Sequence, residues 1–278
     1  MKPESLKILT CFKVTHNLDE ITAEEWNERM ELAVSFMSKT IGMYDESALE
    51  LALRLSDEAV AAGREAELTA LSVGDALTDL MVRSLFAVQY TSVVNVLCDH
   101  DLRFRPDVVA EVIFAFICKN GCENGEFDFI LTGQQANVGD NEMTHVLLSE
   151  RLGIPCVLNV IDASFDKKGL RVTSLVDDGI LEQTISFGKR AVLAMGNAAH
   201  PYLRVPTLRE KMLASKKSVT TIPSYSLVPE FPSSNIAFLG LSRKKTMRNC
   251  RFIDGENASE KALSLYESFP KTLKGNNS

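Results

Sequence analysis

Short apolar runs alternate with helix-like segments along the first half of the chain. The apolar runs, each short enough for a buried strand, span residues 6–14, 67–73, 91–97 and 127–131. The segments between them span residues 41–57, 74–86 and 106–118. In the first of these, Ala48, Leu51 and Leu55 recur at helical spacing. Strands and helices that alternate in this way predict right-handed βαβ units and a parallel sheet.

After Pro155 the continuous apolar runs give way to segments in which apolar and polar residues alternate. Residues 156–161, 170–175 and 182–187 alternate in polarity, and the polar turns DKKG and DDG separate them. This predicts an antiparallel, hairpin-like excursion from the parallel sheet. An apolar strand over residues 191–195 and a short helix over residues 207–214 follow.

Proline and serine replace periodic patterning between residues 222 and 249. A final helix is expected after Asn257, an N-cap residue with Glu260 three positions on. An unpatterned stretch of this length is uncommon inside a compact domain, so we expect it to lie on a partner. The predicted architecture is an α/β domain with an open, mostly parallel, Rossmann-like sheet over residues 1–221. A C-terminal arm with a helix is predicted over residues 222–278.

Composition narrows the classes of function. The net charge of −7 argues against a nucleic-acid-binding surface, which normally needs a concentrated basic patch. The six cysteines and four histidines show no zinc spacing, so we expect reduced thiols and no metal site. The N-terminal stretch MKPESLKILTCFKV reads neither as a signal peptide nor as a membrane anchor. We therefore expect a cytoplasmic protein without a membrane span.

Ligands of an open parallel sheet bind outside the carboxyl ends of its strands. Four predicted strand ends lie at that edge, at residues 11–13, 73–74, 95–96 and 133–141. The last of them belongs to the segment ILTGQQANVGDNEMTHVLLSERLGIP, which has neither a G-x-G-x-x-G motif nor the Lys-Ser/Thr of a P-loop. A loop that leads from a strand into a helix can still hold a phosphate through backbone N–H groups.

Gly139, Asp140 and Asn141 provide the flexible backbone and the capping side chains that such a loop needs. We expect the N–H groups of the following residues to point at an anion, namely Glu142, Met143 and Thr144. An N-cap loop without a ligand explains the same pattern and is the commoner case. His145 could contact a phosphate or equally cap a neighbouring strand.

Motifs of side-chain catalysis are absent from the sequence. It contains no G-x-S-x-G elbow, no H-E-x-x-H pair and no Cys–His arrangement with sequence support. The paired carboxylates Asp177–Asp178 and Glu24–Glu25 lie at a predicted turn and at a solvated helix start. We therefore expect no catalytic side chain in this chain.

Several segments, in order along the chain, resemble one known family. They are LKILTCFKV, YDESALELALRL, ALSVG, GQQANVGDNEMTHVLLSERLGIP, VDDGILEQTISF and PTLREKMLASKK. Together they resemble the beta subunit of electron transfer flavoproteins, as a divergent member, over about residues 6–228. The family's fold is of the adenine-nucleotide-binding type, which agrees with the predicted sheet.

The resemblance implies an electron-transfer subunit rather than a free-standing enzyme. Such a subunit pairs with an alpha subunit that holds most of a FAD, and it moves electrons between acyl-CoA or other dehydrogenases and an acceptor. This chain would bind AMP, or a second FAD in the bifurcating form that oxidises NADH. The nucleotide would contact Cys11, Tyr44, Asp45, Val73, Gly74, Gly139, Asp140, Asn141, Glu142, Met143, Thr144 and His145. Leu208 would contact the partner dehydrogenase.

Other interpretations stay open at this point. A nucleotide-binding regulatory protein without a redox role would use the same scaffold. A subunit that keeps the fold but has lost its nucleotide would serve in assembly alone. Asn141, Met143 and His145 depart from the family's pattern in the loop, so the ligand stays open between AMP, FAD and none.

Overall fold

The computed structural model describes residues 5–17, 21, 37–124, 127–136, 139, 141–233, 239, 250 and 252–269, with side chains 120–124 left undescribed. The chain divides into two compact units, and the described residues from 250 onwards belong to the second. The predicted division into residues 1–221 and a partner-bound arm over residues 222–278 stays a prediction.

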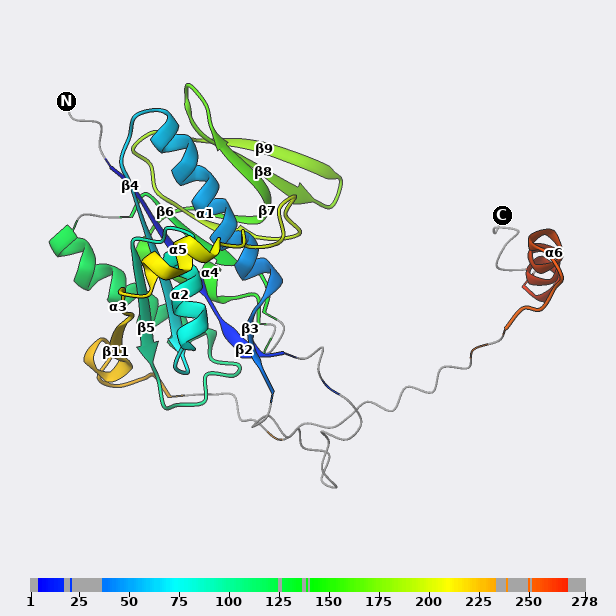
Figure 1. Ribbon diagram of the computed structural model, residues 1–278, viewed down its shortest axis with the longest axis horizontal. Coiled ribbons are helices and arrows are strands. Elements are labelled where there is room, and N and C mark those ends of the chain that lie inside the picture. The colour runs from blue at the N-terminus through cyan, green and yellow to red at the C-terminus, as the bar shows by residue number, and fades with distance from the viewer. Residues whose placement is uncertain are drawn as a thin grey trace. The chain divides into compact units, whose positions relative to one another are not determined.

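A nine-stranded sheet forms the centre of the first unit in the part of the chain described (Figure 1). Its order is β11-β5-β4-β1-β6-β10-β7-β8-β9. The strands span β1 Leu6–Phe12, β4 Ala66–Gly74, β5 Ser92–Leu97, β6 Phe129–Gly133, β7 Cys156–Phe165, β8 Gly169–Val176, β9 Gly179–Ser186, β10 Ala191–Met195 and β11 Thr220–Pro223.

Neighbouring strands run parallel from β11 to β7, and the last two strands are added in antiparallel fashion, β8 on β7 and β9 on β8. The predicted α/β fold with an open, mostly parallel sheet and an antiparallel excursion is confirmed. The excursion forms one edge of the sheet, and Figure 1 shows β8 and β9 extending beyond the helices that cover the rest. A separate antiparallel pair, β2 Val14–His16 with β3 Lys39–Ile41, was not predicted.

Helices cover both faces of the parallel strands. They span α1 Met43–Ala61, α2 Asp79–Ala87, α3 Pro106–Asn124, α4 Thr144–Leu152 and α5 Leu208–Ala214, with a 3-10 turn η2 at Ser224–Ser226. In β1, Ile8 belongs to the core under α1 and α2, and Leu9 to the core under α3 and α4. Because successive side chains point to opposite faces, a strand covered on both sides must be apolar throughout. This explains the continuous apolar runs in the sequence.

The helix predicted to open at Gly74–Asp75 begins later, at Asp79. The Thr78 hydroxyl caps it by accepting the N–H of Met81 at 3.3 Å. Asn95 holds the preceding turn, because its side-chain oxygen accepts the N–H of Leu77 at 3.1 Å. The start of α2 therefore depends on the side chain of Asn95, which lies on β5.

The second unit contains α6 Ala258–Ser268. Asn257 caps this helix as predicted, since its side-chain oxygen accepts the N–H of Glu260 at 3.0 Å. None of the residues of α6 is buried. Over the described residues, none of the helices combines the length and the apolar character needed to cross a membrane.

Candidate functional site

A cleft opens at the carboxyl ends of β1, β4 and β6. The chain adds β4 and β5 on one side of β1 and then crosses to place β6 on the other side, so β1 and β6 flank a topological switch point. Open α/β sheets bind ligands at such points. The cleft contains about 820 Å³ of space between atoms, part of it open to solvent.

Most of the predicted nucleotide contacts line this cleft. They are Cys11, Asp45, Val73, Asn141, Glu142, Met143, Thr144 and His145. Gly74 ends β4, and Gly139 lies in the loop before α4, but neither lines the cleft itself. Asp140 lies outside the described residues. The structure thus gathers residues from distant parts of the sequence, and their role in binding stays a prediction.

Tyr44 lines a smaller pocket beside the cleft. This pocket contains about 300 Å³ between atoms, and its polar side chains include Gln134, Gln135 and Asn159. Gln134 and Gln135 also line the cleft, so the two hollows adjoin. The backbone N–H of Asn159 donates to the Gln134 side-chain oxygen at 2.5 Å, and Asn159 has a positive φ of 50°. Asparagine is among the few non-glycine residues that adopt this left-handed conformation readily.

Asp45 holds two strand ends together at the bottom of the cleft. It lies in the first turn of α1, and its carboxylate accepts the N–H of Lys13 at 2.9 Å and that of Gly133 at 3.0 Å. Burial raises the pKa of Asp45 to about 6, although both backbone hydrogen bonds act to lower it. The carboxylate therefore shapes the cleft by joining the end of β6 to the residue that follows β1.

The N-terminus of α4 faces the cleft two residues later than the sequence predicts. The helix begins at Thr144 with Met143 as the N-cap residue, and the side chain of Met143 makes no capping hydrogen bond. The N–H groups without a partner within the helix therefore belong to Met143, Thr144, His145 and Val146, a set that includes the predicted Met143 and Thr144 but not Glu142. Glu142 has a positive φ of 51°, so strained backbone leads into the helix.

His145 is buried and only 2% exposed. Burial lowers its pKa to about 4, so its imidazole is neutral near pH 7. His145 lines the cleft, and both roles predicted for it, contact with a phosphate and capping of a neighbouring strand, stay predictions.

Sequence reasoning named the strand end at residues 11–13 but did not select Lys13, which lines the cleft. It also missed Gln134 and Gln135. The sequence signal that could have found Gln134 and Gln135 was their position directly after a parallel strand. The third predicted strand end, at residues 95–96, does not line the cleft.

A model of the electron transfer flavoprotein domain matches residues 37–226, more than half of the chain. The chain belongs to the electron transfer flavoprotein family. A protein of Escherichia coli (strain K12), provisionally named electron transfer flavoprotein subunit YgcR, is 29% identical over 275 residues, with 95% of this chain and 97% of the relative covered. The electron transfer flavoprotein subunit beta of Megasphaera elsdenii is 24% identical over 245 residues, covering 87% and 85%. The resemblance recognised in the sequence is confirmed, and the family has an electron-transfer role.

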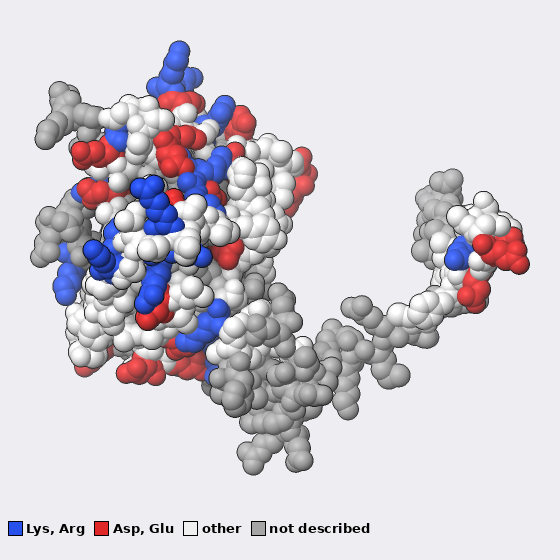
Figure 2. Space-filling model, viewed as in Figure 1, with Lys and Arg blue, Asp and Glu red and all other residues white. Residues whose placement is uncertain are grey.

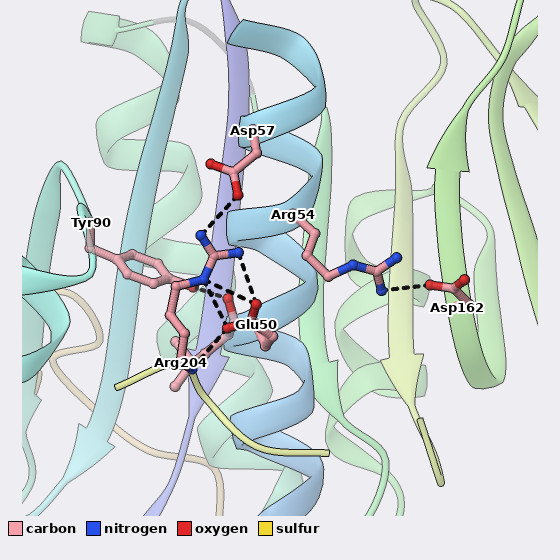
Figure 3. Close-up of polar contacts among 7 residues, drawn as sticks. Glu50, Arg54, Asp57, Tyr90, Asp162 and Arg204 are labelled. Carbon is pink, nitrogen blue, oxygen red and sulfur yellow. Dashed lines mark hydrogen bonds and ion pairs between the residues drawn. The ribbon is translucent and has the colours of Figure 1, made fainter. Parts of the chain in front are cut away.

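The segment of this electron transfer flavoprotein that contains Leu208 is fixed by an arginine (Figure 3). Arg204 donates to the nearly buried carboxylate of Glu50 through its Nε and Nη2 atoms, at 3.0 and 2.8 Å, and through its backbone N–H at 2.9 Å. Its Nη1 atom donates to Asp57 at 2.8 Å. Both carboxylates belong to α1, so the chain before α5 is held against that helix.

An exposed apolar surface follows this attachment. Leu208, the first residue of α5, is 76% exposed, and Val205, Met212 and Leu213 are also exposed. Thr207 and Glu210 form a capping box that fixes the start of α5. Figure 2 shows Lys and Arg side chains around this part of the surface, where exposed basic residues include Arg209, Lys216 and Lys217. The predicted contact of Leu208 with a dehydrogenase stays a prediction.

Proposed function

We propose that this chain is the beta-type subunit of a heterodimeric electron transfer flavoprotein. It pairs with an alpha-type subunit that holds most of a FAD, and the pair passes electrons between a dehydrogenase and an acceptor. The observation that carries this proposal is the match to the family domain over residues 37–226, in a chain whose cleft lies at the switch point of the sheet. The relative from Megasphaera elsdenii is itself named a beta subunit.

The residues of the cleft fit an adenine nucleotide. Leu71, Val73, Leu102 and Ile113 supply apolar walls that suit a flat base. The N-terminus of α4 offers backbone N–H groups and the positive end of a helix dipole, which suit a phosphate. AMP is the ligand we propose for this site. The flavin of the pair supplies the redox chemistry, and this chain binds, orients and shields the groups around it.

A second candidate function is the bifurcating form, in which this chain binds its own FAD and oxidises NADH. One observation favours it. The smaller pocket shares Gln134 and Gln135 with the cleft, and its Tyr44 and Asn159 add further polar groups. A dinucleotide could then place its adenylate half in the cleft and its other half towards this pocket.

Two surfaces support a role in assemblies. The helix α6 has an exposed apolar set, Leu263, Leu265 and Tyr266, with Phe269 directly after it. A helix that leaves such a face uncovered favours packing against another chain, and we propose the alpha-type subunit. For Leu208 and the exposed apolar residues of α5 we propose contact with the partner dehydrogenase, of the acyl-CoA or another type.

The test is co-expression with an alpha-type electron transfer flavoprotein subunit encoded beside this chain. We expect the two chains to co-purify with a bound flavin that a dehydrogenase reduces. A chain truncated after Val228 serves as a matched variant, because it keeps the sheet, and we expect it to fold but to pair poorly. A chain that binds a nucleotide but co-purifies with no alpha-type subunit would contradict the proposal. That result would favour a regulatory protein without a redox role.

A further inference from the structure

Lys13 lines the cleft, and its ammonium group lies beside the loop that leads into α4. The residue directly follows β1, and its side chain lines the cleft. Its Nζ atom lies 3.5 Å from the position that a Cβ atom on Gly139 would take. Gly139 has a φ of +92°, a backbone conformation that side chains disfavour. The ammonium therefore lies beside the loop backbone, at a residue whose conformation favours glycine.

The electrostatics of the cleft depend on this one ammonium. Among the described residues that line the cleft, Lys13 is the only Lys or Arg, while Asp45 and Glu142 are acidic. His145 adds no positive charge near neutral pH, because burial lowers its pKa to about 4. Without Lys13, the charged side chains around an anion in the cleft would be carboxylates alone. Carboxylates alone repel a phosphate, and the backbone N–H groups of one helix would have to overcome that repulsion.

We propose that Lys13 binds the phosphate of the nucleotide in the cleft, opposite the backbone N–H groups at the start of α4. This inference rests on the proposed function, since it concerns the same nucleotide site. Lysine acts towards phosphate as a point charge, which needs no fixed fork geometry and suits a loop of this kind. The phosphate is common to AMP and to the adenylate half of FAD, so the inference holds for either ligand.

Two further observations support this role. Burial lowers the pKa of Lys13, and the charge of Asp45 acts to raise it. A bound phosphate would stabilise the charged ammonium in the same way as Asp45 does. Asp45 also fixes the backbone at Lys13, because it accepts that residue's N–H at 2.9 Å. The point from which the side chain extends is thus held in place independently of any ligand.

The experiment compares ligands that differ only in the phosphate. The full-length chain, purified with its partner and freed of nucleotide, is titrated calorimetrically with AMP and with adenosine. In Lys13→Met we expect the Kd for AMP to rise at least about tenfold, the effect of losing a charge-assisted contact. The Kd for adenosine should change by less than about twofold. If FAD proves to be the natural ligand, AMP against adenosine still tests the part of the site that binds the adenylate half of FAD.

Matched variants separate binding from folding. Lys13→Arg keeps the charge and should restore most of the affinity for AMP, whereas Lys13→Gln should behave like Lys13→Met. Lys189→Met is the control, because that exposed lysine precedes β10 and lies at the opposite end of the parallel strands. An unchanged affinity for AMP, or an equal loss for AMP and adenosine, would overturn the inference. A wild-type complex that contains flavin yet binds neither AMP nor adenosine would overturn this inference while leaving the electron-transfer role intact.

Discussion

Asp45 and Gly133 are joined by a short contact at the floor of the cleft. The backbone N–H of Gly133 donates to Asp45 Oδ1 at 3.0 Å, although the two residues are 88 positions apart in the sequence. A Cβ atom on Gly133 would overlap Asp45 Oδ1 and would lie 3.0 Å from the Asp45 backbone nitrogen and 3.1 Å from the Tyr44 carbonyl carbon. The end of β6 and the first turn of α1 can approach this closely only because residue 133 has no side chain.

Gly133→Ala should therefore destabilise the fold and distort the cleft. We expect the free energy of unfolding to fall by about 1–3 kcal/mol, as for other overpacked sites. Nucleotide content should fall as well. Gly42→Ala is the matched control, because an added Cβ there would lie 3.8 Å from Asp45 Oδ2, an ordinary contact. Urea unfolding of both variants measures the difference, and equal losses would show that the close approach at Gly133 does not matter.

The burial of His145 makes stability depend on pH. Its pKa is about 4 in the folded chain against an ordinary value of 6.5. Between these values the unfolded chain binds a proton that the folded chain does not, so stability falls as pH drops from about 6.5 to 4. The contribution is at most about 3 kcal/mol. Asp45 acts in the opposite direction, because its raised pKa makes stability fall as pH rises from 3.8 to about 6.

Comparison of wild type with His145→Gln isolates the contribution of the histidine, since Asp45 is common to both chains. Urea unfolding at pH 5 and at pH 7 is the measurement. We expect the variant to lose less stability than wild type on going to pH 5. Identical losses in the two chains would mean that His145 is not held neutral by burial.

Arg204 should matter more for stability than other arginines in ion pairs. Arg204→Ala leaves Glu50, which is 8% exposed, without the arginine that donates to both of its carboxylate oxygens. We expect a loss of about 2–3 kcal/mol in the free energy of unfolding. Arg103→Ala is the control, because Arg103 and Asp101 are both substantially exposed, and its loss should stay below about 1 kcal/mol. Thermal or urea unfolding measures the stability of both variants. Equal stability would contradict this expectation.

The sequence predicted the sheet because its strands carry the signal themselves. Strands covered by helices on both faces are apolar throughout, and the turn sequences DKKG and DDG separate the strands of the excursion. The pair β2–β3 escaped prediction because strands of three residues are too short to show a period. The start of α4 was misplaced because Asp140 and Asn141 are good capping residues, whereas the actual N-cap, Met143, is not.

The sequence predicted where the candidate site lies but not what its individual side chains do. Strand ends and a loop before a helix located the cleft, because ligands of parallel sheets bind at that edge. The contact of Asp45 with Lys13 and Gly133 joins residues 32 and 88 positions apart, and no local pattern encodes it. The neutral state of His145 likewise follows from burial, which depends on the packing of α4 and not on its sequence alone.

Counting the nucleotides bound to the purified complex tests the central claim most directly. The chain is purified with its alpha-type partner, the complex is denatured, and the released nucleotides are separated and identified by mass. We expect one FAD and one AMP per pair, and two FAD without AMP would select the bifurcating form instead. One FAD alone would contradict the nucleotide site in this chain. A complex that releases no flavin would contradict its function as an electron transfer flavoprotein.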